Sequence, residues 1–293
     1  DMVPKDTESE NIWKSLGVGD IRKEGMEDVF WGPTGASGPC GPTTEIYCKN
    51  ADGKDVEIWN IVFNEFLCSG SREQLLAGNA VLTPLEKKGI DTGMGLERLA
   101  MISQNKKNIF ETDLFEPLIV VLPNELSVSM KRIIVDHLRA SVFLLADGVR
   151  PSNKESGYVL RRLLRRTIVR EHTHKISPQV FESILLEVIK DYHEDYPQLF
   201  EKKDEVINEF WREWERFTKT VHMGIKEFRK VSLVDAKEAF KLFESYGLPF
   251  EVIKELDEEK TRLLTREDFD VEYARHQELS RAGLEKKFGG HGL

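Results

Sequence analysis

The spacing of apolar and polar residues divides the chain into a part with strand patterns and a part with helix patterns. Apolar and polar residues alternate in "TTEIYC" (43–48) and "EIWNIVFNEFLC" (57–68), as in half-buried strands. From about residue 125 onward, apolar residues recur every three or four positions, as on one face of a helix. The sequence therefore predicts an α+β protein, with a mixed domain over 1–118 and a mainly helical domain over 119–293.

The predicted strand at 57–68 has two chemically different faces. One face carries Asn60 and Asn64 among apolar residues, whereas the opposite face carries Trp59, Ile61, Phe63 and Leu67. A face that bears amides suits a sheet that lines a pocket. The preceding stretch "GPTGASGPCGPTTE" (32–45) is dense in glycine and proline, so we expect a rigid loop there.

In the second half, the pattern predicts a helix in 129–148 that Gly148 stops, and further helices over 156–172 and 204–230. A short helix that ends at Gly247 and Pro249, another helix after it, and a final charged helix follow. The glycines of "FGGHGL", at the end of the sequence, suggest a linker to a further domain. The helix at 204–230 carries an apolar stripe that is typical of core packing: Ile207, Phe210, Trp214, Phe217, Val221, Ile225 and Phe228.

The stretch "DTGMGLERLAMISQ" concentrates an acid, two glycines and an arginine where a helix begins. The apolar spacing starts this helix near Gly95, and Gly93 and Gly95 allow a tight turn or a close approach to a ligand. Asp91 could hold an ammonium group, and Arg98 could hold a phosphate. An ordinary capped helix with a surface acid–base pair explains the same residues, so the pattern alone leaves both alternatives open.

The composition is that of a globular protein, with 40% hydrophobic and 32% charged residues. There is no apolar run of membrane-spanning length and no signal peptide. The three cysteines form no C-x-x-C, which predicts reduced thiols, a cytoplasmic protein and no zinc. His172 and His174 form an H-x-H pair without nearby cysteines or carboxylates, so we predict no metal site.

The net charge of −9 argues against nucleic-acid binding through total charge, but "LRRLLRRTIVR" concentrates positive charge locally. RNA phosphates would explain this basic helix, and so would acidic partners within the chain. Both alternatives stay open. Its arginines are Arg161, Arg162, Arg165, Arg166 and Arg170.

Several short segments of the sequence resemble segments of the class II aminoacyl-tRNA synthetases of the alanyl type, and they occur in the same order. "DTGMGLER" resembles their motif 3, and "VFWGPTGASGPCGPTTEIY" and "EIWNIVFNEF" resemble the loop and strands before it. "DHLRASVFLLADGVRPSNKESGYVLRRLLRR" and "EAFKLFESYGLPFEV" follow in the family's order, so the similarity spans essentially the whole chain. The resemblance implies the C-terminal half of a class II catalytic domain, with part of its antiparallel sheet, and a helical tRNA-recognition domain.

In the first domain, the resemblance implies an alanine site. Trp31 would wall the pocket, and Asn60 and Asp91 would hold the polar end of the amino acid. Gly93 would keep the pocket floor low under the methyl side chain.

The resemblance also implies ATP, together with Mg²⁺, as a substrate that Arg98 and Gly95 contact. Alanine would first be activated to alanyl-adenylate and then transferred to the 3′ end of tRNA(Ala). Catalysis of this kind depends on positioning and charge stabilisation more than on a titrating base.

In the helical domain, the resemblance implies recognition of a G·U wobble pair in the tRNA acceptor stem. The resemblance implies that Asn153 is the asparagine that recognises this base pair. Glu244 stands at the position where the family has an aspartate that recognises the pair together with the asparagine. Glutamate keeps the charge and the acceptor oxygens but extends their reach by one methylene. Phosphate contacts, which position the RNA, would come from Arg161, Arg162, Arg165 and Arg166.

The chain departs from the family in what it contains. Motifs 1 and 2 of the catalytic domain and the zinc cluster of the editing domain are not found in the 293 residues, and Thr43 replaces a usual cysteine. We therefore expect the isolated chain to be weakly active or inactive, with an N-terminal half and an editing domain as its missing partners. Two alternatives are a non-catalytic tRNA-binding module and a paralogue that activates alanine for another carrier.

Overall fold

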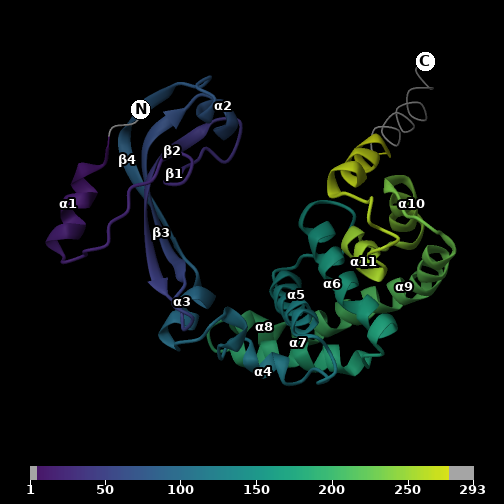
Figure 1. The fold of residues 1–293 in the computed structure, drawn as a ribbon. Helices are drawn as coiled ribbons and strands as arrows, with labels where there is room; N and C mark the ends of the chain where they lie inside the picture. Colours follow the sequence, from purple (N-terminus) through teal and green to yellow (C-terminus); the bar gives the residue numbers. More distant parts are fainter. Residues whose placement is uncertain (1–4, 277–293) are drawn as a thin grey trace, which may run out of the picture. The chain divides into compact units, whose positions relative to one another are not determined.

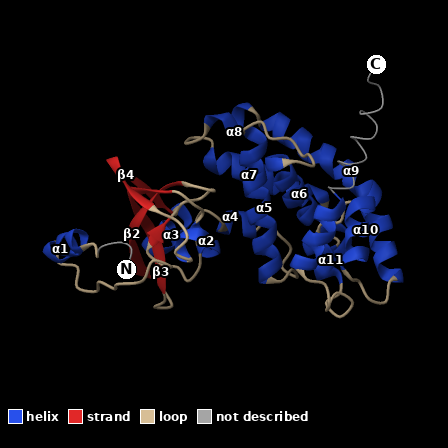
Figure 2. Ribbon diagram, turned by 90° about the horizontal axis from the view of Figure 1, so that it is seen from above, coloured by secondary structure: helices blue, strands red, loops and turns tan. Residues whose placement is uncertain are grey.

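A computed structural model describes residues 5–276, which fall into two compact units, Asp1–Glu116 and Pro117–Leu293. Figure 2 shows the strands in the first unit only, and the predicted α+β fold is confirmed. The first unit contains α1 (Thr7–Ser15), β1 (Phe30–Trp31), β2 (Gly38–Lys49), β3 (Asp55–Cys68), α2 (Arg72–Leu76), β4 (Leu82–Met94), α3 (Leu96–Ser103) and η1 (Ile109–Glu111). After α4 (Glu116–Ile119) at the boundary, the second unit contains α5 (Val128–Ala146), α6 (Glu155–His174), α7 (Pro178–Tyr192), α8 (Pro197–Glu201), α9 (Lys203–Lys230), α10 (Ala236–Tyr246) and α11 (Phe250–Leu256).

The first unit is built on an antiparallel sheet with the strand order β1-β2-β3-β4 (Figure 1). The predicted strand at 57–68 lies within β3, which pairs with β2 on one side and β4 on the other. A small core of Phe30, Cys40, Cys68, Leu75 and Ala80 packs at one end of this sheet. Arg72 of α2 donates to the backbone carbonyl of Glu27 at 2.9 Å, which ties α2 to the segment before β1.

The predicted loop over 32–45 is wrong in its second half, because β2 already begins at Gly38. Pro42 is accommodated because the β2–β3 register shifts beside it, and a proline is tolerated at such a bulge. A Cβ at Gly41 would lie 1.7 Å from the carbonyl oxygen of Phe63, so only glycine lets the two strands approach this closely. The glycines and prolines of this stretch therefore serve an irregular strand.

The predicted tight turn at Gly93 and Gly95 is also wrong, whereas the predicted helix start is confirmed. The strand β4 stays extended to Met94, and α3 begins one residue later with Gly95 as its N-cap. Neither glycine has a positive φ, and a Cβ at Gly93 would meet no atom within 4 Å. The backbone conformation therefore does not require glycine at position 93.

The second unit is a helical array around α9, the longest helix of the described residues. The helices predicted in 129–148, 156–172 and 204–230 are confirmed as α5, α6 and α9, and Gly148 follows α5 with a φ of +88°. Phe210 and Phe217 of the predicted stripe are fully buried, as core packing requires. Within residues 5–276, no helix combines the length and apolar composition needed to cross a bilayer.

Two features lie at the C-terminal end. Gly247 caps α10 with a φ of +70° and α11 follows Pro249, as predicted. The predicted charged helix is helical over 266–276, and its remainder lies outside the described residues together with the glycine linker.

Candidate functional site

The strand register brings three of the predicted alanine-site residues to one face of the sheet. Asn60 of β3 pairs directly with Gly93 of β4, and Asp91 pairs with Val62, two positions further along. Directly paired residues and positions two apart share a face, so Asn60, Asp91 and Gly93 lie together. The side chain of Asp91 is exposed, and the space above Gly93 is open.

Glu45, which the sequence reasoning missed, joins this face from β2. It pairs with Asn60, whose Nδ2 donates to Glu45 Oε1 at 3.1 Å. The Tyr47 hydroxyl donates to Glu45 Oε2 at 2.8 Å, and this bond raises the pKa of Tyr47 to about 12. Asn60 Oδ1 is buried without a hydrogen-bond partner in the described chain. The alternation in 43–48 was the signal that could have placed Glu45 here.

Of the three remaining predicted residues, Gly95 and Arg98 lie at the start of α3, and Trp31 lies further away on β1. Arg98, in the first turn of α3, donates from Nη1 to the Glu57 carbonyl at 2.8 Å and lies 3.3 Å from the Glu57 carboxylate. Trp31 pairs with Gly41, and β2 separates its strand from β3. Trp31 is therefore two strand spacings from Asn60 across the sheet and, because Asn60 pairs with Glu45, also four residues away along β2, so their backbones are roughly 16 Å apart.

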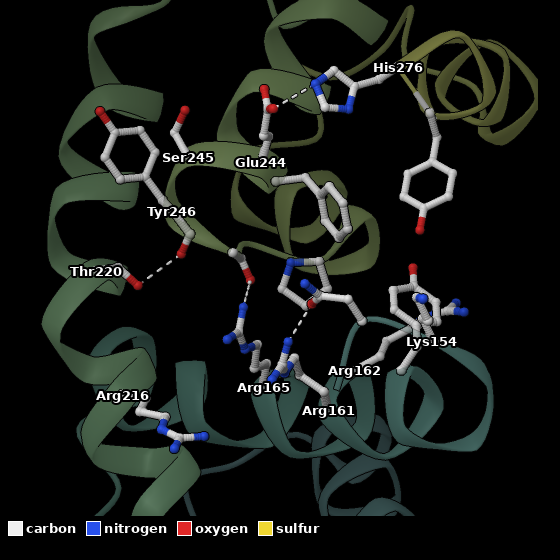
Figure 3. A pocket seen from close by; sticks show the side chains of 16 residues that line it. Lys154, Arg161, Arg162, Arg165, Arg216, Thr220, Glu244, Ser245, Tyr246 and His276 are labelled. Atoms are coloured by element: carbon white, nitrogen blue, oxygen red, sulfur yellow. Dashed lines mark hydrogen bonds and ion pairs between the residues drawn. The ribbon is translucent and has the colours of Figure 1, made fainter. Parts of the chain in front are cut away.

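The second unit contains a cavity of about 730 Å³ between α6, α9 and the turn after α10. Among the side chains that line it, Lys154, Arg161, Arg162, Arg165 and Arg216 are basic and only Glu244 is acidic. Figure 3 shows the arginines of α6 on one side of the cavity and Glu244 with His276 on the other. Five of the six predicted RNA-binding residues, from Asn153 to Glu244, thus line one cavity.

Arg166, the sixth predicted residue, does not line this cavity. Its Nη2 donates to Glu255 of α11 at 3.1 Å, and Arg170 also pairs with Glu255. Burial lowers the pKa of both guanidinium groups, to about 10 for Arg170. These contacts indicate that Arg166 holds α6 against α11, and we do not include it in the RNA site.

The cavity arginines also have acidic partners within the chain, as one of the two alternatives expected. Arg162 donates from Nε to Glu251 at 3.1 Å, and Arg165 donates from Nε to Glu213 at 2.7 Å. Arg161 lies 3.5 Å from the same Glu213 carboxylate. In the described chain, Lys154 and Arg216 have no carboxylate within ion-pair distance. The basic helix therefore has intramolecular partners and still faces the cavity.

The two predicted reading residues are each held by one contact. Arg161 Nη1 donates to Asn153 Oδ1, and Arg161 Nη2 donates to the Pro151 carbonyl at 2.9 Å. On the opposite side, Glu244 Oε1 lies 2.7 Å from His276 Nε2. Each reading residue therefore keeps one polar group for a ligand: the Nδ2 donors of Asn153 and Oε2 of Glu244.

Residues 5–276 contain no group of three or more His, Cys, Asp or Glu side chains that could hold a metal ion. At the C-terminal end of α6, Thr173 Oγ1 and His174 Nδ1 lie 2.8 Å apart. The expectation that this segment binds no zinc stays a prediction.

Comparison with known proteins identifies the class to which this architecture belongs. The family model described as "tRNA synthetases class II (A)" matches residues 1–290, so the chain belongs to the class II tRNA synthetases. The similar curated proteins carry a more particular name, alanine–tRNA ligase, and the resemblance to the alanyl type is confirmed.

Three relatives show the extent of the match. The alanine–tRNA ligase of Borrelia hermsii is 35% identical over 325 residues, which covers 99% of this chain and 53% of the relative. Those of Petrotoga mobilis and Fervidobacterium nodosum are 33% and 36% identical and cover 96% and 94% of this chain, but only 35% and 34% of the relatives. The chain thus spans between about a third and a half of the length of these relatives.

Proposed function

We propose that this chain is part of an alanine–tRNA ligase, in which the first unit binds alanine and ATP and the second unit reads the acceptor stem of tRNA(Ala). The observation that carries the proposal is the cavity of the second unit. It gathers Asn153 and Glu244, which are distant in sequence, with three arginines of α6. Membership of the class II synthetases supports the enzymatic part.

In the first unit, alanine would lie across β3 and β4 on the open face above Gly93. Asp91 would supply the counter-charge of the ammonium group, and Asn60 would help to hold the polar end of the amino acid, as the resemblance implies. Glu45 would orient Asn60 through the 3.1 Å hydrogen bond to its amide. The resemblance implies that Trp31 walls the site, but the strand register does not bring it next to Asn60.

ATP would be the second substrate, with Arg98 contacting its phosphates from the first turn of α3. Arg98 is only weakly held, because its side chain is 51% exposed and its 3.3 Å ion pair is with a partly exposed Glu57. Phosphate can therefore compete with Glu57 for this guanidinium. Mg²⁺ would arrive bound to ATP as part of the substrate.

In the second unit, the cavity suits the shallow minor groove of an A-form RNA helix. A G·U wobble pair leaves the guanine 2-amino group free as a donor beside the uracil O2 acceptor. Glu244 Oε2 would accept from the amino group, and Asn153 Nδ2 would donate to an acceptor of the groove. The surrounding basic side chains would contact phosphates.

An RNA-binding experiment with the chain tests this function. Fluorescence anisotropy would compare acceptor-stem hairpins that contain one G·U, G·C or inosine·U pair, and inosine removes only the 2-amino group. We expect the tightest binding to the G·U hairpin and a preference of about tenfold, typical of one well-placed base contact. Asn153→Ala should reduce that preference. Equal affinities for all three hairpins would refute the reading role.

The alanine site has its own test, which separates a synthetase from a module that only binds tRNA. Calorimetry with alanine should detect binding to the wild-type chain and not to Asp91→Ala, because the ammonium loses its counter-charge. Glu86→Ala, an exposed acid on the same strand, is the matched control. Hairpin binding without any alanine binding would favour the non-catalytic module.

Catalysis by the isolated chain is a separate matter. We expect little alanine-dependent exchange between ATP and pyrophosphate, because the chain spans at most about half the length of the relatives compared above. Robust exchange would show that these 293 residues hold a complete adenylation site.

A further inference from the structure

A buried carboxylate lies behind the cavity, in the packing stripe of α9. Glu213 is 1% exposed and stands between the buried residues Phe210 and Phe217. A glutamate is almost never fully buried unless it is paired. Its position in an apolar stripe therefore indicates that this carboxylate has a function in the protein interior.

The contacts of Glu213 lead to both sides of the cavity. Its Oε1 accepts from Arg165 Nε at 2.7 Å and lies 3.5 Å from Arg161 Nε. Arg165 in turn donates from Nη1 to the carbonyl of Gly247 at 3.2 Å, three residues after Glu244. One carboxylate on α9 thus pairs with two guanidinium groups of α6 and, through Arg165, is linked to the end of α10. Figure 3 shows Arg165 beside this end of α10.

Arg161 passes this constraint on to Asn153. Arg161 Nε forms no hydrogen bond in the described chain, so the 3.5 Å ion pair with Glu213 acts on it by charge attraction. Because a guanidinium group is planar and presents its donors in a fixed fork, this attraction at the Nε edge also favours one direction of the Nη donors. Those donors contact Asn153 Oδ1 and the carbonyl of Pro151. Because Arg161 occupies the oxygen of the Asn153 amide, the Nδ2 donors are the part that remains for a ligand.

We propose that Glu213 is a positioning residue which, through Arg161, makes the Asn153 amide present its donors to the RNA minor groove. The proposal rests on the RNA-reading function of the cavity and adds a buried residue to that function. Without Glu213, the Arg161 guanidinium can rotate away, and the amide can then turn either its oxygen or its nitrogen toward the groove. Only the nitrogen side is complementary to uracil O2.

A double-mutant cycle on the chain tests the chemical link. Glu213→Gln removes the charge at nearly constant volume and should lower the G·U over G·C preference about tenfold, as Asn153→Ala does. The double variant should lose no more preference than Asn153→Ala alone, because both changes act through one amide. Additive losses would mean that Glu213 acts elsewhere, and the proposal would be overturned.

A second readout needs no RNA. In ¹⁵N-labelled chain, the Asn153 side-chain amide signals are identified by their loss in Asn153→Ala. Glu213→Gln should move these two signals toward those of a solvent-exposed asparagine. Unchanged signals would overturn the proposal. If the wild-type chain shows no G·U preference, the proposed function fails, and the amide signals alone decide whether Glu213 orients Asn153.

The matched control is Glu255→Gln. Glu255 also bridges two arginines of α6, Arg166 and Arg170, but none of these three residues lines the cavity. This variant should keep both the G·U preference and the Asn153 signals, and an equal loss in Glu255→Gln would overturn the proposal. If Glu213→Gln does not fold, Glu213→Asp retains the charge with a shorter reach and should show a partial loss of preference.

Discussion

Lowering the pH should destabilise the second unit through His137, a buried histidine of α5. Its side chain is 7% exposed, and Nδ1 has no hydrogen-bond partner in the described chain. Burial, together with the charges of Arg166, Arg162 and Arg170, lowers its pKa from 6.5 to about 4. The nearby Glu251 acts in the opposite direction but is outweighed.

The sign and size follow from linkage. Between pH 6.5 and pH 4 the unfolded chain binds a proton at this histidine and the folded chain does not, so stability falls as the pH falls. The difference between 6.5 and about 4, at 1.36 kcal/mol per unit, amounts to about 3 kcal/mol in full, most of it lost by pH 4.5. Above pH 6.5 the contribution is complete and constant.

Urea denaturation followed by circular dichroism at several pH values between 7.5 and 4.5 measures this effect. His137→Gln cannot titrate, so the wild-type chain should lose about 2 kcal/mol more stability than this variant over the range. His193→Gln, at the partly exposed end of α7, is the control and should keep the wild-type pH dependence. Parallel curves for wild type and His137→Gln would show that His137 is not kept neutral by burial.

Three further predictions test the two sites. Gly93→Val should change the free energy of unfolding by less than ~1 kcal/mol, because a Cβ at this position would meet no other atom within 4 Å. It should nevertheless abolish alanine binding in calorimetry. The control is Gly89→Val, at an equally open position of β4, which should bind alanine normally. Gly247→Ala should destabilise the chain by ~1–3 kcal/mol in thermal melts, because alanine is strained at a left-handed φ and its Cβ would lie 2.0 Å from Arg165 Nη1. Gly53→Ala is the control: Gly53 has a similar φ in open space, so this variant measures the backbone strain without the clash. The logarithm of the hairpin binding constant should fall with the logarithm of the salt concentration with a slope of about −2. The reason is that, of the basic side chains that line the cavity, only Lys154 and Arg216 have no carboxylate partner in the described chain. A slope near −4 would show that the ion pairs of the cavity arginines open on binding.

Regular patterns in the sequence were enough to predict most of the elements and the face that carries the alanine-site residues. The alternation in β3 predicted an amide-bearing face, and the register places Asn60 there beside Asp91 and Gly93. What the pattern could not provide was the partner strand of each residue. Glu45 joins Asn60 only because β2 pairs with β3 in one particular register, and this register depends on long-range packing.

The missed features share one physical cause, which is that local rules were overridden by close tertiary contacts. The first part of β2 looked like a loop, but Gly41 permits a strand contact that no side chain would allow. Glu213 was not singled out in the sequence, because a glutamate is usually a surface residue. The signal that could have found it is its spacing of three and four residues from Phe210 and Phe217, which places it in the buried stripe.

The two interpretations of the basic helix turn out not to exclude each other. A long, flexible arginine that faced RNA without support would lose much side-chain entropy on binding. Glu213 and Glu251 already pair with three of these arginines in the folded chain, so less side-chain entropy remains to be lost when RNA binds. In the proposed function, the same pairing would reduce the charge that attracts RNA at long range, and Lys154 and Arg216 would keep that role. An acidic chain can therefore present a local site for RNA whose arginines contribute direction more than net charge.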